Sequence, residues 1–361
     1  MQDLLRFFLA LSVVIFHYKH FAIQSALSLP PDDYVAPFSE VLDLIYRHGY
    51  HAVAVFFFLS GYMLASRLNT NTISTFSYRN FLIKRLARIY PAHGATLLVM
   101  GLVAIIVNQL SLKPFMTYND NIANFVASIF LLNGTGIMRD TSFNLPAWSL
   151  SVEVICYVAF GAVCALSTKR RGTLFFLGLL AGVAIKEISS DPNIGNVGSG
   201  MVFFFAGTIA AAKFKPLRDR FLPNDQIAIT VLLGIFALSF SLSLYTSLGL
   251  QKLIWIFLSL PALVIAVTAI DDKLSQIKGR PFLWLGLMSF SIYIWHFPVQ
   301  AVLHYLLNGI QIDGMPAYNS KALFWLYLVS VVTVAHISLM TIEKWGSSLI
   351  RSLTIPKSSE L

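Results

Sequence analysis

The chain has 361 residues, of which 57% are hydrophobic, 14% aromatic and only 12% charged, and its mean hydropathy is +0.71. This composition excludes an ordinary soluble globular domain and indicates an integral membrane protein. The formal net charge of +9 does not indicate a nucleic-acid partner, because the basic residues stand in short loops between apolar runs, as membrane topology requires.

Ten apolar runs are long enough to cross a bilayer, for which about 20 residues are needed. They cover residues 4–22, 50–66, 89–110, 147–167, 172–187, 198–213, 227–247, 252–270, 282–307 and 322–343. We therefore expect an all-α fold, a polytopic membrane bundle of about ten transmembrane helices. No internal repeat divides the chain, so residues 1–361 are expected to form one domain. A shorter apolar piece, residues 122–133, is expected to be re-entrant or interfacial.

The loops between these runs alternate in charge, and the alternation predicts the orientation of the chain. The basic loops carry Arg67, Arg79, Lys84, Arg85 and Arg88, then Lys169, Arg170 and Arg171, then Lys213, Lys215, Arg218 and Arg220, then Lys273, Lys278 and Arg280, with Lys344, Arg351 and Lys357 in the tail. The alternate loops are neutral or acidic, with Asp32, Asp33, Glu40 and Asp43 in one and Glu187 and Asp191 in another. Positive-inside counting then places both termini in the cytoplasm.

The first run encloses two ionisable residues in apolar sequence. Arg6 and His17 are eleven positions apart, about 1100° on an α-helix, so they share one face at a separation of about 16 Å along the axis. Ionisable groups inside a bilayer usually face a protein interior or a watery cavity and mark function. The alternative is an Arg6 that reaches the headgroups and a His17 satisfied by a neighbouring helix.

The second and third runs carry two further candidate features. Ser60-Gly61 lies in an aromatic helix, where a small pair permits close helix packing or lets a thin ligand pass near the backbone. Arg85 and Arg88 are three residues apart at the cytoplasmic mouth of the third run, so they are neighbours on a helix and suited to bidentate phosphate contacts. An ordinary basic stop sequence is the alternative for these arginines.

The fourth and ninth runs each contain a polar stripe. Ser149, Glu153 and Tyr157 recur at helical spacing, and a carboxylate within the bilayer needs a partner. In the ninth run the stripe is formed by Ser289, Tyr293, His296, Gln300 and His304, with Trp295 and Pro298 beside His296. Such a stripe can join helices, but five polar groups in line favour the wall of a cavity.

Together these pieces resemble the acyltransferase 3 family of integral membrane acyltransferases, over nearly the whole chain and in the expected order. The residues that carry the resemblance are Arg6 with His17, the segment Phe57-Phe58-Leu59-Ser60-Gly61-Tyr62, Arg85 and Arg88 followed by Ile89-Tyr90-Pro91, Trp148-Ser149-Leu150 with Glu153, and Ser289-Phe290-Ser291-Ile292-Tyr293-Ile294-Trp295-His296-Phe297-Pro298. Tyr62 stands where the family often has Phe. The chain resembles the stand-alone form, without a C-terminal esterase-like domain.

The resemblance implies a multi-pass enzyme of the bacterial cytoplasmic (inner) membrane that moves an acyl group, commonly acetyl, from cytoplasmic acyl-CoA to a hydroxyl of a carbohydrate, a lipid-linked glycan or another surface acceptor. Acyl-CoA is then a co-substrate, and no metal is predicted. The implied catalytic residues are His17 as base, Glu153 as orienting carboxylate and Arg6. The implied acyl-CoA site comprises Arg85, Arg88, Ser60 and Gly61, and the implied acceptor site Trp148, Tyr293, Trp295 and His296.

Two questions stay open at this level. A transporter or flippase of similar substrates would also place polar stripes in ten spans, although no pair of Gly/Pro-broken segments in matching halves indicates an inverted repeat. Within the enzyme hypothesis, the hydroxyl either attacks the thioester directly, which we favour, or receives the acyl group from an acyl-imidazole on His17. The sequence does not distinguish among acceptors.

Overall fold

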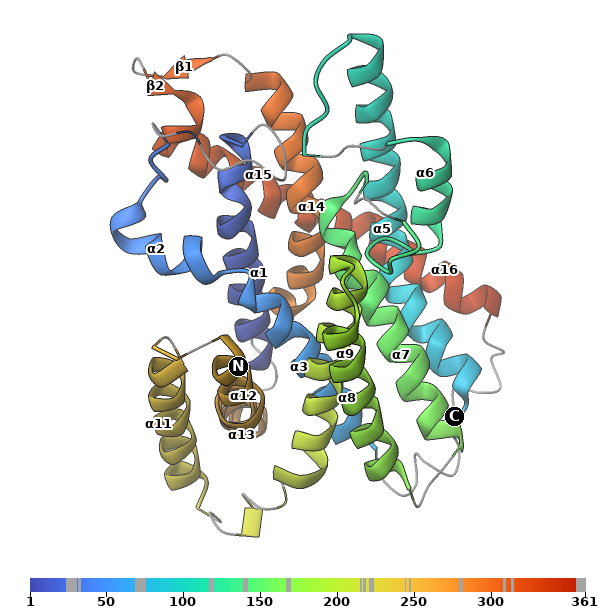
Figure 1. Ribbon diagram of the computed structural model, residues 1–361, viewed down its shortest axis with the longest axis vertical. Helices are drawn as coiled ribbons and strands as arrows, with labels where there is room; N and C mark the ends of the chain where they lie inside the picture. Colours follow the sequence, from blue (N-terminus) through green and yellow to red (C-terminus); the bar gives the residue numbers. More distant parts are fainter. Residues whose placement is uncertain are drawn as a thin grey trace.

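The computed structural model describes residues 1–23, 31, 34–68, 76–116, 120–138, 142–166, 170–214, 216, 219–220, 224–243, 245–246, 248–278, 282–307, 310–312 and 315–354. Most of these residues are helical, as Figure 1 shows. The described strands form one short antiparallel pair, β1 (Gln311–Ile312) with β2 (Met315–Pro316). The predicted all-α class is therefore confirmed.

The helices follow the apolar runs closely. In chain order they are α1 (Gln2–His17), η1 (Tyr18–Phe21), α2 (Ser39–His48), α3 (His51–Ser66), α5 (Tyr78–Gln109), α6 (Ile122–Ile129), η2 (Leu145–Ala147), α7 (Trp148–Leu166), α8 (Arg171–Ile188), α9 (Pro192–Ile209), η3 (Ala210–Phe214), α11 (Asp225–Ser243), α12 (Leu248–Ile254), η4 (Trp255–Ser259), α13 (Leu260–Lys278), α14 (Leu283–Leu307), η5 (Ala317–Asn319), α15 (Lys321–Ser338), η6 (Leu339–Glu343) and α16 (Lys344–Thr354). The segments η3, η4 and η6 are single π-helical turns that continue the helices beside them.

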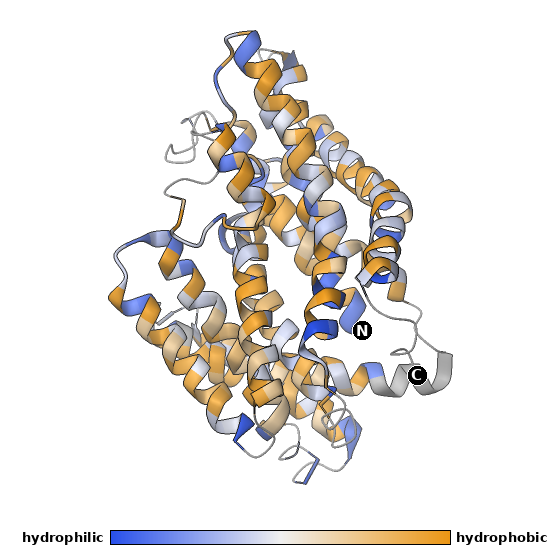
Figure 2. Cartoon of the chain, turned by 90° about the vertical axis from the view of Figure 1, so that its right-hand side faces the viewer, coloured by the Kyte–Doolittle hydropathy of each residue, from blue (hydrophilic) through white to orange (hydrophobic). Residues whose placement is uncertain are grey.

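Eight helical segments of the described chain are long and apolar enough to cross a membrane, and α2 with α3, bent by 58°, makes a possible ninth. The remaining predicted run, residues 172–187, corresponds to α8, which is not among these segments because its 18 residues include three charged side chains, Arg171, Lys186 and Glu187. Figure 2 shows apolar residues along the lengths of the helices and most hydrophilic residues at their ends and in loops. The chain is a multi-pass integral membrane protein.

The orientation of the termini stays a prediction. Several loop charges on which it depends lie outside the described residues, namely Asp32, Asp33, Lys169, Lys215, Arg218, Arg280 and Lys357. The short apolar piece at residues 122–133 contains α6, which has 8 residues and is too short to span. The imidazole Nε2 of His93 in α5 lies 2.8 Å from the carbonyl oxygen of Ser128, and this contact ties α6 to the middle of α5.

The core is built where α1 packs against α14 and where α3 packs against α9. In Figure 1, α1 and α14 run side by side at the centre, and α11, α12 and α13 lie at the lower left, where α13 contacts α1 and α3. Glycines bring α3 and α9 into backbone contact: a Cβ on Gly61 would lie only 1.9 Å from the carbonyl oxygen of Phe204, and one on Gly207 only 2.1 Å from that of Phe58. This contact fixes the face that α3 turns toward α7.

Candidate active site

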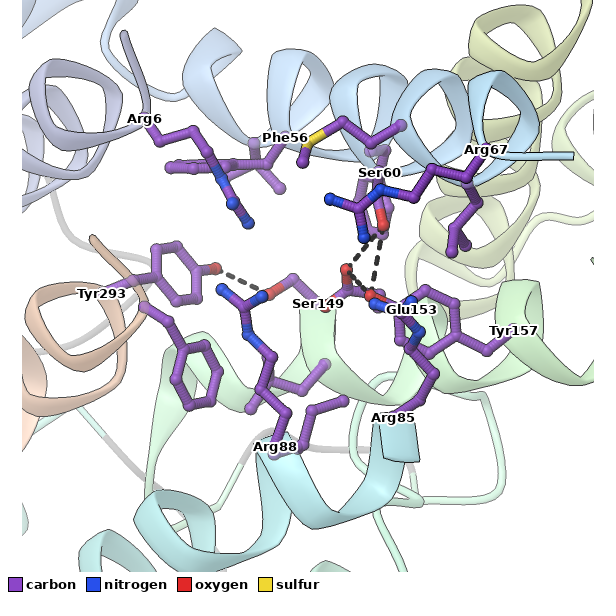
Figure 3. A pocket seen from close by; sticks show the side chains of 17 residues that line it. Arg6, Phe56, Ser60, Arg67, Arg85, Arg88, Ser149, Glu153, Tyr157 and Tyr293 are labelled. Carbon is purple, nitrogen blue, oxygen red and sulfur yellow. Dashed lines mark hydrogen bonds between the residues drawn. The ribbon is translucent and has the colours of Figure 1, made fainter. Parts of the chain in front are cut away.

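A cavity lies among α1, α3, α5, α7 and α14, the helices that carry the predicted motifs (Figure 3). Its polar wall consists of four guanidinium groups, one carboxylate and several hydroxyls, from Arg6, Ser60, Arg67, Arg85, Arg88, Ser149, Glu153, Tyr157 and Tyr293. Four positive charges against one negative charge make the cavity strongly cationic. Such a cavity suits a polyanionic ligand.

The two arginines of α5 enter the cavity from the same side because they are three residues apart on one helix. The guanidinium of Arg85 lies 5.6 Å from the ring centre of Phe81 and 5.7 Å from that of Tyr157, both within cation–π range. Within the described residues, Arg6, Arg85 and Arg88 form no ion pair with a carboxylate. Their charges are therefore available to an anion.

Glu153 is held by hydroxyl donors. Ser60 Oγ donates to Glu153 Oε1 at 3.0 Å, and Tyr157 OH donates to the same oxygen at 2.5 Å. The Ser60 and Tyr157 hydroxyls are themselves 3.2 Å apart. The polar stripe of α7 therefore meets Ser60 of α3, and the hydrogen bonds described for Glu153 go to these hydroxyls rather than to an imidazole.

Tyr293 of α14 and Ser149 of α7 line the end of the cavity that lies beside α14. Their hydroxyl oxygens are 2.7 Å apart, and Tyr293 OH also lies 3.2 Å from the carbonyl oxygen of Pro146. Tyr293 is almost fully buried, and with Val13 of α1 and Ala52 of α3 it forms a small apolar cluster. The described cavity ends at this cluster, so Arg6 lines the cavity whereas His17, on the same face of α1, does not.

Beyond Tyr293 lies a pair of imidazoles. Nδ1 of His17 is 3.0 Å from Nε2 of His296, and the two rings are parallel to within 5°. Nδ1 of His296 is 2.5 Å from the carbonyl oxygen of Tyr293, which can only accept, so this nitrogen carries a hydrogen. Nε2 of a neutral His296 must then accept from Nδ1–H of His17. This leaves Nε2 of a neutral His17 with its lone pair, and the structure gives that nitrogen no partner among the described residues.

Gln300 and His20 contact His17 of the histidine pair. Gln300 Nε2 donates to the backbone carbonyl oxygen of His17 at 2.8 Å, which anchors the C-terminal end of α1 to α14. The buried ring of His20 lies 4.9 Å from that of His17. Within the described part of the chain, no group of three or more His, Cys, Asp or Glu side chains is arranged to hold a metal ion.

The predicted site residues thus fall into three sets. Arg6, Ser60, Arg85, Arg88, Glu153 and Tyr293 line the cavity. His17 and His296 form the pair behind Tyr293. Gly61, Trp148 and Trp295 do not line the cavity: Gly61 faces the backbone of α9, Trp148 lies beside Phe57, and Trp295 packs in the main core cluster.

Three polar residues of the cavity wall, Arg67, Ser149 and Tyr157, were not among the predicted site residues. Ser149 and Tyr157 belong to the polar stripe of α7, so the helical spacing from Glu153 was a sufficient signal for them. Arg67 was assigned only to a basic loop, yet it follows Ser60 by seven residues, about two helical turns, and therefore continues the same face of α3.

The fold and the site together define a polytopic membrane protein with a cationic cavity that ends beside a buried imidazole pair. The family model described as "Acyltransferase domain" matches residues 3–340. The chain therefore belongs to the acyltransferase 3 family, and the predicted resemblance is confirmed.

Among curated proteins, the chain is 27% identical over 303 residues to a protein of Staphylococcus aureus (strain COL) whose name provisionally assigns it as an O-acetyltransferase, covering 72% of this chain and 48% of that protein. It is 26% identical over 281 residues to the acyltransferase MdmB of Streptomyces mycarofaciens (72% and 70%). It is 24% identical over 285 residues to the peptidoglycan O-acetyltransferase OatA of Listeria monocytogenes (70% and 45%).

The chain spans about half the length of the Staphylococcus and Listeria relatives. No solved structure matches it significantly.

Proposed function

We propose that the chain is a membrane O-acyltransferase that moves an acetyl group from cytoplasmic acyl-CoA to a hydroxyl of a carbohydrate or lipid-linked glycan at the outer face of a bacterial cytoplasmic membrane. Membership in the acyltransferase family supports the reaction class, and the names of the relatives support acetyl and an oxygen acceptor. The observation that carries the proposal is that the cationic cavity ends at Tyr293, whose backbone carbonyl holds the His296–His17 pair.

The acyl-CoA half of the proposed site is the arginine wall, by which we mean Arg6, Arg67, Arg85 and Arg88. Coenzyme A is polyanionic and cannot enter hydrocarbon, so its phosphates belong at Arg85 and Arg88, with Arg6 and Arg67 beside them. The narrow pantetheine arm then extends between α3 and α7 toward Ser149 and Tyr293. Because the Tyr293 side chain separates the described cavity from His17, this side chain has to move before a thioester can reach the imidazole.

The chemical step is assigned to His17. Its Nε2 accepts the proton of the acceptor hydroxyl while the hydroxyl oxygen forms a bond to the thioester carbonyl carbon. The carbon–sulfur bond then breaks, and the imidazolium returns the proton to the leaving thiolate, so that the products are an O-acyl ester and free coenzyme A. No net proton is taken up or released. This is the direct-attack route, and an acyl-imidazole is the alternative that the test below distinguishes.

His296 is assigned a positioning role rather than the acceptor-binding role that the family resemblance implied. Its Nε2 accepts from Nδ1–H of His17 both before and after Nε2 of His17 is protonated, so it fixes the reactive tautomer and stabilises the imidazolium. His296→Gln keeps an acceptor oxygen near this place and should retain part of the turnover. His296→Leu removes the acceptor and should lose most of it, with a lowered plateau in the pH–rate profile.

The test uses the full chain in lipid nanodiscs with radiolabelled acetyl-CoA and a glycan and lipid extract of the source cells. Wild type should release coenzyme A and label a component of the extract, which mass spectrometry then identifies. His17→Ala should bind acetyl-CoA with nearly unchanged affinity yet transfer no label. His304→Ala changes a histidine of α14 whose ring centre lies 4.5 Å from that of Phe115, and this matched control should remain active.

The outcomes separate the competing functions. Unlabelled extract with wild-type protein, together with movement of a glycan across the membrane of reconstituted vesicles, would replace the enzyme with a transporter. Full transfer by His17→Ala would remove His17 from the mechanism. Acetyl-protein formed from acetyl-CoA alone and absent in His17→Ala would replace direct attack with the acyl-imidazole route.

A further inference from the structure

Two helices of the candidate site contain an interior proline two or three residues after a predicted site residue. Pro91 follows Arg88 in α5, and Pro298 follows His296 in α14. Proline has no backbone N–H, so the carbonyl four residues earlier loses its helical donor. The two carbonyls released in this way belong to Ala87 and Ile294, both fully buried residues, and a buried carbonyl without a donor is destabilising.

In α14 the released carbonyl is taken up from another part of the chain. Asn144, which is 2% exposed and lies just before η2, donates from Nδ2 to the carbonyl oxygen of Ile294 at 3.0 Å. The turn between Ile294 and Pro298 is the one that carries His296. Two residues after Asn144, the carbonyl oxygen of Pro146 accepts a hydrogen bond from Tyr293 OH. The short segment from Asn144 to Pro146 therefore contacts both Tyr293 and the turn that carries His296.

In α5 the corresponding donor comes from the C-terminal helix. Ser347 Oγ of α16 donates to the carbonyl oxygen of Ala87 at 2.7 Å. The preceding residue is Gly346, and a Cβ there would lie 2.8 Å from Cβ of Pro91, so only glycine lets α16 approach the proline this closely. The turn held in this way carries Arg88. Ser347 lies beyond residues 3–340, the part of the chain that the family model matches.

We propose that Asn144 and Ser347 are positioning residues that each take up a proline-released carbonyl and thereby hold one half of the acyl-transfer site. The inference rests on the proposed function and deepens it. Ser347 fixes the turn of Arg88 and therefore acts on the binding of acyl-CoA. Asn144 fixes the turn of His296, hence the partner of His17, and therefore acts on the rate of transfer. The prolines are required for this arrangement, because without them the helix would satisfy both carbonyls by itself.

The experiment is a pair of double-mutant cycles with the full chain in nanodiscs. Ser347→Ala should raise the dissociation constant of acetyl-CoA by about threefold to tenfold, the range of one hydrogen bond, with a smaller change in the rate at saturation. Asn144→Leu should lower the saturated rate by about tenfold with a smaller change in acetyl-CoA affinity. In Pro91→Ala and Pro298→Ala backgrounds, where an N–H is restored, each substitution should change its parameter by less than about twofold.

Matched controls separate positioning from general destabilisation. Ser347→Thr keeps the hydroxyl and should restore acetyl-CoA affinity. Ser352→Ala changes a serine of the same helix whose hydroxyl, within the part of the chain that the structure describes, donates to the carbonyl oxygen of Leu349 in its own turn, and it should leave affinity unchanged. Asn133→Leu removes a buried asparagine that bonds to Ser128 Oγ instead of a proline-released carbonyl, so it should lower the melting temperature without the selective loss of rate.

Additive effects in either cycle, or equal losses of affinity and rate in both single variants, would overturn the inference while wild type still transfers acetyl. An inactive wild type would instead overturn the proposed function, and with it the assignment of separate roles. Coupling in both cycles, with affinity affected through α5 and rate through α14, is the expected result.

Discussion

At the scale of single residues, Arg88 is the clearest candidate for binding the proposed acyl-CoA, because it enters the cavity without an ion-pair partner in the described chain. Arg88→Ala should raise the dissociation constant of acetyl-CoA by about tenfold to a hundredfold, the range of a hydrogen bond to a charged group. Arg88→Lys should recover only part of this loss, since Lys lacks the bidentate fork. Binding is measured by titration with labelled acetyl-CoA.

Arg79→Ala supplies the control for this prediction. Arg79 is an exposed arginine in the first turn of the same helix and does not line the cavity. An equal loss of affinity in the Arg79 and Arg88 variants would mean that the effect is general surface charge and not a phosphate site.

Glu153 is the single carboxylate among the cavity-lining residues, and its replacement has two separable consequences. Glu153→Gln keeps an oxygen that accepts from Ser60 and Tyr157, so the fold should survive. Removing a negative charge from the arginine wall should leave acetyl-CoA binding unchanged or tighter. If the carboxylate orients the reaction as predicted, turnover should fall by about a hundredfold or more. Turnover equal to that of wild type would reduce Glu153 to a structural group.

At the scale of elements, the contact between α3 and α9 decides between the two interpretations of Ser60-Gly61. The serine faces the cavity, whereas the glycine faces the backbone of Phe204. Gly61→Ala should therefore force the two helices apart and destabilise the protein by about 1–3 kcal/mol, seen as a lower melting temperature in nanodiscs. Ser60→Ala should change turnover more than stability.

Gly234→Ala in α11 is the matched control, because nothing lies within 4 Å of a Cβ built there. Alanine favours helix over glycine, so this variant should melt at the same temperature or slightly higher. If Gly61→Ala weakened acetyl-CoA binding with an unchanged melting temperature, the glycine would instead line a ligand path.

At the scale of the whole molecule, the orientation of the bundle is open to direct measurement. Both native cysteines, Cys156 and Cys164, are free thiols and buried. A single cysteine introduced on the surface can therefore be labelled with little reaction of the native thiols. Positive-inside counting predicts that Glu40→Cys in α2 reacts with an impermeant maleimide in intact cells. Ser352→Cys in α16 should react only after the membrane is opened. The reverse pattern would place the arginine wall outside and exclude cytoplasmic acyl-CoA as its ligand.

The sequence was sufficient for the class of fold and for most of the cavity. Long apolar runs can only be helices in a bilayer, because every backbone polar group must find its partner within the segment. Helical spacing likewise groups Arg85 with Arg88, and Ser149 with Glu153 and Tyr157, since residues three or four apart share a face. These are local properties, and the structure repeats them without change.

The relations between helices were decided only by the tertiary structure. The sequence indicated only that Glu153 needs a partner, and the family resemblance implied acceptor binding for His296. In the structure, Glu153 accepts hydrogen bonds from Ser60 and Tyr157, and His296 contacts His17, 279 residues away in sequence. Likewise, Pro91 and Pro298 predict from the sequence that two backbone carbonyls lack a helical donor. Local sequence does not indicate that Ser347 and Asn144 donate to these carbonyls. Hydrogen bonds between helices depend on crossing angles and on glycine contacts such as those of Gly61 and Gly346, which arise only when the whole bundle has assembled.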